Sequence, residues 1–295
     1  MDSLRKLQLE LVNYCNYRCP LCRTLRKDHV RRRQLELNEL DKIIHSLPEA
    51  LDSIALYGTR GEPFLHPDLE LATRSLKQKT GAFIDISTNG SLVTPNRAQG
   101  ILDAGLDRII FAIDGLSQDS YQTYRVGGQL QTVVNNLKYL CNLKSSGGYK
   151  TRIIAQWIPM KSNEHEQEHL EMVARTWGVD EVRIKYSHSV QRSPEFRTKN
   201  PGATREASSR ITCAFGLDKL YIDPNADCYP CCYAEGRGDL RLGNALEQPI
   251  EEIWTSPLAT RIRTALRKDS GHHPFCEETC ANRAPRKKQR LRIVT

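Results

Sequence analysis

The chain has 295 residues, of which 39% are hydrophobic, and its formal net charge is +8. This length can bury a large core, but no apolar run approaches the roughly 20 residues of a membrane-spanning helix. The first residues also lack the apolar segment of a signal peptide, so we expect a cytoplasmic protein that does not contact a membrane. In that compartment the ten cysteines favour metal binding over disulfides.

The first cysteine group follows an apolar alternation over residues 7–12, which predicts a strand. It reads Cys15-Asn-Tyr-Arg-Cys19-Pro-Leu-Cys22, so three thiols can converge on one side of a metal centre. A structural zinc site normally needs four protein ligands, and no fourth cysteine or suitable histidine is near. An iron–sulfur cluster held by three thiolates would leave one iron open to a small molecule. We favour the cluster, with a zinc knuckle as the alternative.

These residues resemble the radical S-adenosylmethionine (radical SAM) superfamily, whose signature is this cysteine spacing after the first barrel strand. The resemblance implies a [4Fe–4S] cluster at Cys15, Cys19 and Cys22 that binds SAM. It also implies one-electron cleavage of SAM to a 5′-deoxyadenosyl radical, with a flavodoxin- or ferredoxin-type protein as electron donor. The residue before the third cysteine, usually aromatic in the family, is Leu21.

Helical and strand patterns then alternate along the chain. Six strand–helix units in this order predict a parallel sheet with right-handed crossovers. The resemblance implies the specific form, a partial (β/α)6 TIM-like barrel over residues 1–190. Helices are predicted at 37–44, 68–76, 96–104, 130–143 and 164–177, and strands at 53–57, 82–87, 108–113, 151–157 and 180–186.

Polar residues follow several of these strands, where parallel barrels carry their chemistry. Gly61-Glu62-Pro63 looks like the family's glycine–glutamate–proline motif, which implies contact with the SAM amino group. Further polar groups suited to ribose, carboxylate or substrate are Ser87, Asn89, Asp114 and Gln156.

Three cations are candidates for orienting or deprotonating a substrate, namely Arg60, Arg125 and Lys185. Arg125 belongs to Tyr124-Arg-Val-Gly-Gly128, which resembles a segment common in the SPASM subgroup of radical SAM enzymes. Its guanidinium could bind a carboxylate in a bidentate manner or simply brace a loop.

The remaining cysteine groups follow residues 191–211, which lack periodicity and are predicted to be a linker. Residues 212–282 resemble the SPASM domain or its shortened "twitch" form, a small α+β unit that carries auxiliary clusters. The resemblance implies one auxiliary [4Fe–4S] cluster, with a zinc site as the alternative. The cysteines that align best with the shortened form are Cys213, Cys231, Cys276 and Cys280.

Cys228 and Cys232 are then left over. A free Cys232 near the barrel mouth could donate a hydrogen atom to a substrate radical, which would make the enzyme an epimerase. Alternatively it packs as a small apolar residue, or it is a ligand in place of the neighbouring Cys231.

Positive charge gathers in residues 23–33 and in a basic tail, residues 283–295. The ordinary interpretation of both is a solvated surface. Beside the cluster, the first group could instead dock an acidic electron donor or bind an anionic substrate. We do not expect nucleic acid, because no aromatic stripe or known binding module accompanies the charge.

The resemblance points to dehydrogenation or epimerisation of a small polar substrate such as a sugar or aminocyclitol. The alternative is a maturase that modifies a precursor peptide, against which no leader-binding segment is expected before the first strand at about residue 6. A third hypothesis is a non-catalytic iron–sulfur or zinc protein that binds nucleic acid through its basic tail. The pattern leaves the oligomeric state open.

Overall fold

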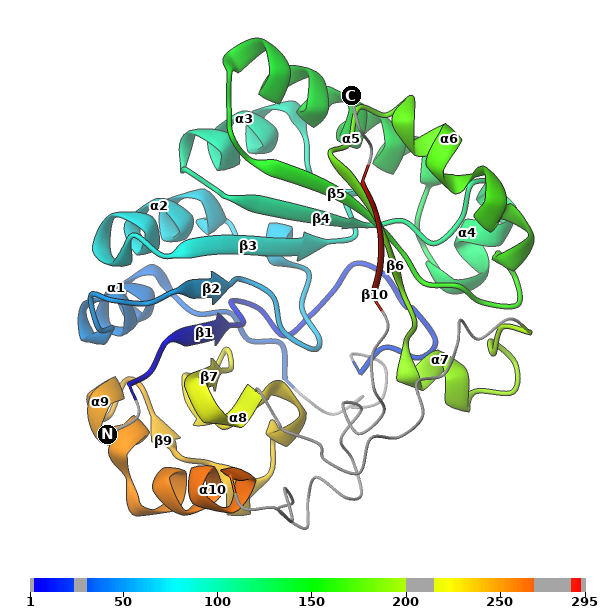
Figure 1. Ribbon diagram of the computed structural model, residues 1–295. Coiled ribbons are helices and arrows are strands. Elements are labelled where there is room, and N and C mark those ends of the chain that lie inside the picture. Colours follow the sequence, from blue (N-terminus) through cyan, green and yellow to red (C-terminus); the bar gives the residue numbers. More distant parts are fainter. Residues whose placement is uncertain (1–2, 24–30, 200–214, 268–287, 293–295) are drawn as a thin grey trace.

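One mixed sheet organises the protein. The computed structural model describes residues 3–23, 31–199, 215–267 and 288–292 (Figure 1). Its ten strands lie in the order β10-β6-β5-β4-β3-β2-β1-β7-β8-β9. The six expected strands are present and pair in parallel, each with the next along the chain. They are β1 (Lys6–Leu9), β2 (Ser53–Ala55), β3 (Phe83–Thr88), β4 (Arg108–Ala112), β5 (Arg152–Trp157) and β6 (Glu181–Lys185). The predicted partial barrel is confirmed.

Helices cover the outer face of this sheet (Figure 1). They are α1 (Leu37–Ser46), α2 (Leu69–Thr80), α3 (Pro95–Asp103), α4 (Gln118–Tyr124), α5 (Leu130–Gly147) and α6 (Leu170–Arg175), with 3-10 turns η1 (Pro63–Leu65) and η2 (Glu164–His169). A reciprocal capping box between Glu36 and Glu39 starts α1. The single helix predicted over 164–177 is instead η2 followed by α6, and α4 was not predicted.

Strand residues alternate between an apolar outer face and a polar inner face, as period-2 geometry requires. Leu7, Leu9 and their outer-face counterparts on the next five strands are buried beneath the helices. On the inner face, Arg108 pairs with Asp85 at 2.7 Å and Arg152 with Glu181 at 2.7 Å. Because these pairs sit near the strand starts, the polar space left for a ligand lies at the C-terminal ends.

The cysteine-rich unit extends this same sheet. Its first strand, β7 (Lys219–Ile222), pairs in parallel with β1, and β8 (Asp227–Tyr229) and β9 (Gly243–Asn244) follow antiparallel. Its other described elements are α8 (Phe215–Asp218), η3 (Cys232–Ala234), η4 (Gly238–Leu240), α9 (Ile250–Thr255) and α10 (Pro257–Arg267). The unit is α+β as expected. Its strand β7 forms hydrogen bonds with β1 of the barrel. The sequence predicts two successive units and does not predict this shared sheet.

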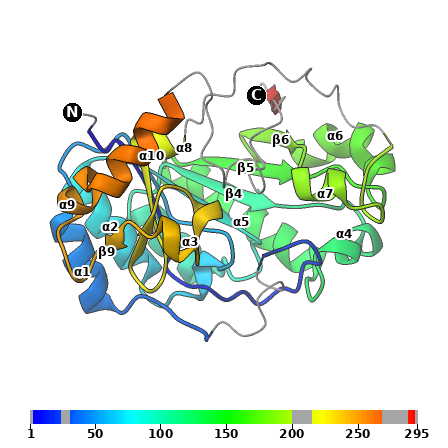
Figure 2. The same cartoon turned by 90° about the horizontal axis from the view of Figure 1, so that it is seen from below.

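The opposite edge of the sheet is closed by β10 (Lys288–Arg292), which pairs antiparallel with β6. The sequence predicts a basic tail over residues 283–295 and no strand within it. The open edge of β6 offers unpaired backbone groups, and a strand that covers them satisfies those groups. Within the expected linker, α7 (His188–Arg192) forms a short helix. Figure 2 shows α9 and α10 at one end of the molecule and α4 and α6 at the other. In the described part of the chain, no helix is long and apolar enough to cross a membrane.

Candidate functional site

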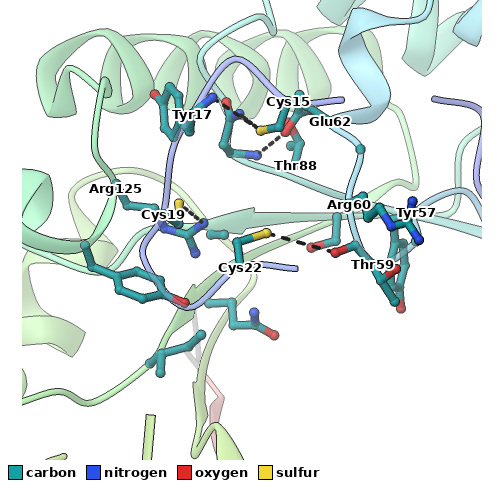
Figure 3. Close-up of a pocket in the computed structure, with 18 of the residues that line it drawn as sticks. Cys15, Tyr17, Cys19, Cys22, Tyr57, Thr59, Arg60, Glu62, Thr88 and Arg125 are labelled. Atoms are coloured by element: carbon teal, nitrogen blue, oxygen red, sulfur yellow. Dashed lines mark hydrogen bonds between the residues drawn. The ribbon is translucent and has the colours of Figure 1, made fainter. Parts of the chain in front are cut away.

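A polar cavity of about 270 Å³ lies at the C-terminal ends of the barrel strands (Figure 3). Three of its lining residues are the cysteines of the first group, and most of the others follow strands β2 to β6. The residues predicted for the site that line it are Cys15, Cys19, Cys22, Arg60, Gly61, Glu62, Ser87, Asn89, Arg125, Gln156 and Lys185. The structure therefore brings together groups that lie up to 170 residues apart in the sequence.

The cysteine loop presents its three thiols to this cavity, and each thiol has a different neighbour (Figure 3). The sulfur of Cys15 accepts hydrogen bonds from the Tyr17 backbone N–H at 3.4 Å and from Asn89 Nδ2 at 3.8 Å. Arg125 Nη1 donates to the sulfur of Cys19 at 3.8 Å. Cys22 donates to the carbonyl of Thr59 at 4.0 Å. Two of the sulfurs thus already accept the kind of N–H bond that stabilises a thiolate ligand.

These thiols fit an iron–sulfur cluster. Burial raises the pKa of Cys15 to about 12 and also raises the pKa of Cys19, so a bound cation is needed to stabilise the thiolates. Among the described residues, no three His, Cys, Asp or Glu side chains are close enough to share a single metal ion. The described lining of the cavity contains these three cysteines and no further cysteine or histidine. A zinc knuckle needs four such ligands, so the donor set fits an iron–sulfur cluster with one open iron better.

The loop of residues 58–62 forms a second wall, and its glycines have a steric role. A Cβ on Gly61 would lie 1.8 Å from the carbonyl oxygen of Val12, and one on Gly58 would lie 1.9 Å from the carboxyl carbon of Glu10. Only glycine allows the backbone to approach this closely. Pro63 begins η1 and does not line the cavity.

Glu62 is buried, and its carboxylate binds the end of β3. One oxygen accepts from Thr88 Oγ1 at 2.5 Å and from the Phe64 backbone N–H at 3.2 Å, while the other accepts from the Asn89 backbone N–H at 2.8 Å. Burial is the main reason why the pKa of Glu62 is raised. The side chain that we expected to receive an ammonium therefore ties two cavity walls together.

The turn after β3 is connected to the cysteine loop. Asn89 Nδ2 donates to Asn16 Oδ1 at 2.9 Å as well as to the Cys15 sulfur, and its own Oδ1 accepts from Ser91. Ser87 lines the cavity one position before Thr88. Both predicted residues are in place for a polar ligand, and Asn89 also orients the loop that carries the thiols.

Asp114 has a different position from the one predicted. It is fully buried and does not line the cavity; its carboxylate accepts from the Ile158 backbone N–H at 2.7 Å and pairs with Arg125 at 2.5 Å. Since both oxygens are used in this way, Asp114 positions Arg125 and does not face a ribose. Arg125 in turn reaches Cys19.

Arg60 is also held by a carboxylate. Its guanidinium lies 2.9 Å from Glu235 in a buried ion pair, although the residue lines the cavity. Gln156 and Lys185, from the ends of β5 and β6, also line the cavity.

Cys232 does not line the cavity. It is buried, and burial raises its pKa to about 11, although the Gln8 side chain donates a hydrogen bond to the thiol and lowers the pKa in part. Cys228 is fully buried in β8, where it donates to the carbonyl of Ala226, and its pKa is also raised by burial. Cys231 is half-buried. The other three expected auxiliary ligands, Cys213, Cys276 and Cys280, lie outside the described residues.

Several cavity residues were missed from the sequence, including Tyr17, Tyr57, Thr59 and Tyr124. The most informative omission is Glu10, which does not line the cavity itself. It is a buried carboxylate directly after β1 that accepts the backbone N–H groups of Arg60 and Gly61 in the cavity wall. The alternation Leu7-Gln-Leu-Glu-Leu places Glu10 on the same face as Gln8. That pattern could have marked it as a site residue.

The basic group after the cluster loop borders a second cavity of about 720 Å³. Arg31 and Arg32 are exposed there, and Arg32 lies over the ring of Tyr14. Arg33 is paired with Glu39. Arg31 and Arg32 therefore belong to a solvated surface, as expected, whereas Arg33 forms an ion pair with the first turn of α1.

Comparison with known proteins agrees with this geometry. The family model described as "Radical SAM superfamily" matches residues 9–173, and the model described as "Iron-sulfur cluster-binding domain" matches residues 213–281. A probable GTP 3′,8-cyclase of Methanococcus maripaludis is 29% identical over 46% of this chain and 45% of its own length. The chain thus spans about half the length of that relative. A "tungsten-containing aldehyde ferredoxin oxidoreductase cofactor-modifying protein" of Pyrococcus furiosus is 26% identical over 88% of this chain and 83% of its own.

Solved structures share the fold. BtrN in complex with AdoMet and 2-DOIA superposes with a TM-score of 0.60 at 17% identity, over 95% of this chain and 94% of that one. SuiB of Streptococcus suis bound to the precursor peptide SuiA gives a TM-score of 0.66 at 14% identity, over 96% of this chain and 71% of that one.

Proposed function

The chain belongs to the radical SAM superfamily, and from this membership we propose that it removes a hydrogen atom from a carbon of a small polar substrate of the sugar or aminocyclitol kind. It is a radical SAM enzyme whose second domain binds iron–sulfur clusters, and SAM and [4Fe–4S] are its cofactors. The proposed outcome is oxidation of a secondary alcohol, with epimerisation as the alternative. The observation that carries the proposal is the single cavity that joins the three thiols to polar groups from the strand ends.

In this proposal Cys15, Cys19 and Cys22 hold the [4Fe–4S] cluster, and the backbone of residues 61–62 with Ser87 and Asn89 binds SAM. When bound, these cofactors supply one electron and the 5′-deoxyadenosyl radical that removes the hydrogen. The protein orients SAM against the substrate and excludes water from the cavity. Asn89 contributes to both tasks, because it contacts the Cys15 sulfur and the loop that carries it.

We propose Lys185 and Gln156 as the groups that orient the substrate. They line the cavity from the ends of β6 and β5. Arg60 and Arg125 line it as well, where their pairs with Glu235 and Asp114 hold the cavity walls in place. After loss of the hydrogen atom, oxidation of the alcohol to a carbonyl releases one proton from the hydroxyl and one further electron. In this proposal Lys185, which lines the cavity, orients that hydroxyl and accepts its proton as a neutral amine. We assign the electron to one auxiliary [4Fe–4S] cluster at Cys213, Cys231, Cys276 and Cys280, in a unit spanning residues 212–282.

The position of Cys232 favours oxidation over epimerisation. An epimerase must return a hydrogen atom to the substrate, but the Cys232 thiol is buried against Gln8 outside the cavity lining. Peptide modification is the second candidate, since the chain also shares its fold with SuiB bound to the precursor peptide SuiA. We favour a small substrate because the structure of BtrN in complex with AdoMet and 2-DOIA aligns over 94% of its own length, whereas the peptide-bound SuiB structure aligns over 71% of its own.

The remaining partners are also proposals. A flavodoxin- or ferredoxin-type donor would supply the electron, and the exposed cations Arg31 and Arg32 near the cluster loop would suit its acidic surface. A reducing compartment keeps the thiols available as ligands, which favours the cytoplasm.

The test is anaerobic reconstitution of the full chain, followed by assays of iron, sulfide and 5′-deoxyadenosine formed from SAM under dithionite. The triple variant Cys15→Ala, Cys19→Ala, Cys22→Ala should lose deoxyadenosine formation and about half of the iron. Deuterium at the reacting carbon of a sugar or aminocyclitol substrate should appear in deoxyadenosine. A wild-type protein that never cleaves SAM, or that binds zinc in place of iron, would overturn the proposal.

A further inference from the structure

The loop of residues 58–62, which faces the cavity, is held from two sides by buried carboxylates. On one side, Glu10 Oε1 accepts the backbone N–H groups of Arg60 and Gly61, both at 2.7 Å. The other oxygen of Glu10 accepts the hydroxyl of Tyr221, a residue of β7 in the cysteine-rich unit. Glu10 is 1% exposed, so these bonds are shielded from water.

On the other side, the same loop is held by Glu235. The carboxylate pairs with Arg60 at 2.9 Å, and its second oxygen accepts from Thr59 Oγ1 at 2.8 Å. The side chains of Arg60 and Glu235 are only 6% and 2% exposed. A buried ion pair of this kind leaves an uncompensated charge when one partner is removed. The loop conformation therefore depends on a residue more than 170 positions away.

The segment that contains Glu235 also reaches the cysteine loop. Arg23 Nη1, one residue after Cys22, donates to the carbonyl of Cys232 at 2.9 Å, and its guanidinium lies over the ring of Tyr233. Both walls of the cavity, the thiol loop and the loop of residues 58–62, therefore contact residues 232–235. This segment directly follows Cys231, which we assign to the auxiliary cluster.

We propose that residues 232–235 are a positioning element for SAM, and that the ion pair of Glu235 with Arg60 sets the SAM affinity of a cavity that lies in the other unit. This inference rests on the proposed function, since it takes SAM as the ligand of the cavity. Glu235 acts through Arg60 and Thr59 and does not itself line the cavity. The cysteine-rich unit then has two tasks, to hold a cluster and to shape the cofactor site.

The test uses the full-length reconstituted protein and compares Glu235→Gln with the matched control Asp239→Asn. Both changes replace a carboxylate by an amide within five positions, but Asp239 pairs with Arg237 on the surface. We expect Glu235→Gln to weaken SAM binding at least tenfold, measured by equilibrium dialysis of labelled SAM without reductant. The KM for SAM should rise by a similar factor while kcat at saturating SAM changes less. Asp239→Asn should match the wild type in both.

A double variant separates positioning from simple loss of structure. In Arg60→Gln/Glu235→Gln both charges of the pair are removed, so no buried charge is left alone and part of the SAM affinity should return. Iron content should equal that of the wild type in every variant. If Glu235→Gln fails to retain iron, Tyr221→Phe takes its place in the test. This change removes only the hydrogen bond from the Tyr221 hydroxyl to Glu10, and it should still raise the Kd of SAM severalfold.

Wild-type SAM affinity in Glu235→Gln or in an iron-replete Tyr221→Phe would overturn the inference. A double variant that binds SAM no better than Glu235→Gln would also overturn it. These results would leave the proposed function intact, because SAM would still be cleaved. A wild-type protein that neither binds nor cleaves SAM would instead remove the proposed function itself.

Discussion

At the residue scale, the cavity depends on backbone positions where a side chain cannot fit. Gly61 faces the carbonyl of Val12, and its backbone N–H binds Glu10. The sequence suggested this glycine through the Gly61-Glu62-Pro63 pattern. The contact that makes it necessary could not be foreseen, because it comes from the loop after β1 and requires the folded sheet.

Replacing Gly61 by alanine should therefore damage the site. The added Cβ would stand 1.8 Å from the Val12 oxygen, so the backbone must move away from Glu10. We expect a loss of stability of about 1–3 kcal/mol and at least a tenfold slower formation of deoxyadenosine. Thermal unfolding and the SAM cleavage assay measure the two effects.

The control is Gly238→Ala in η4, where an added Cβ would meet nothing within 4 Å. It should behave as the wild type in both assays. A Gly61→Ala protein with the stability and SAM turnover of the wild type would show that the loop can relax at little cost.

Arg125 could be identified as a candidate from the sequence, but its partners Cys19 and Asp114 could not. Its bond to the Cys19 sulfur and its pairing with Asp114 place a cation beside the proposed cluster. Hydrogen bonds to cluster sulfurs stabilise the reduced form and raise the reduction potential. We therefore expect Arg125 to tune the reduction potential of that cluster.

Arg125→Lys should make the potential of the SAM-binding cluster more negative by roughly tens of millivolts, because lysine lacks the planar fork that reaches both partners. An anaerobic redox titration followed by electron paramagnetic resonance measures this shift. Arg32→Lys, an exposed change near the same loop, should leave the potential unaltered. An unchanged potential in Arg125→Lys would mean that the contact with Cys19 has no electronic effect.

At the scale of elements, clear hydrophobic periodicity was a reliable guide. Strands such as β3 and β4 have apolar residues on the covered face and could be recognised locally, as could the long helix α5. The pairing of strands that lie far apart in the chain could not be recognised in this way. The short segment Lys219–Ile222 predicts a strand, but only the folded sheet shows that it pairs with β1. The strand β10 was not predicted because its sequence is rich in basic residues, which are more typical of a solvated tail than of a strand.

The strand β10 leads to a prediction about the basic tail. Removing residues 288–295 uncovers the backbone of β6, the strand whose last residue, Lys185, lines the cavity. We expect a lower melting temperature and a greater tendency to aggregate, with SAM cleavage retained. Calorimetry, light scattering and the deoxyadenosine assay measure these outcomes. Loss of affinity for RNA or DNA as the main effect would instead support a nucleic-acid-binding protein.

At the scale of the whole molecule, the sheet runs without a break through both units. The strand β1 lies between β2 and β7, so it is central and not an edge. Buried contacts cross the same boundary, from Glu10 to Tyr221 and from Arg60 to Glu235. The division at residue 190 that composition suggests therefore separates two lengths of chain but not two independent sheets.

A fragment of residues 1–190 should consequently fail to fold stably. It would expose the backbone edge of β1 and lose the buried contacts that Arg60 and Glu10 make with Glu235 and Tyr221. The full chain should unfold in one cooperative transition, whereas the fragment should be largely insoluble or lack a sharp transition in circular dichroism and calorimetry. A soluble, cooperatively folded fragment that binds iron at its three cysteines would show that the barrel is autonomous and that the shared strands are only a docking contact.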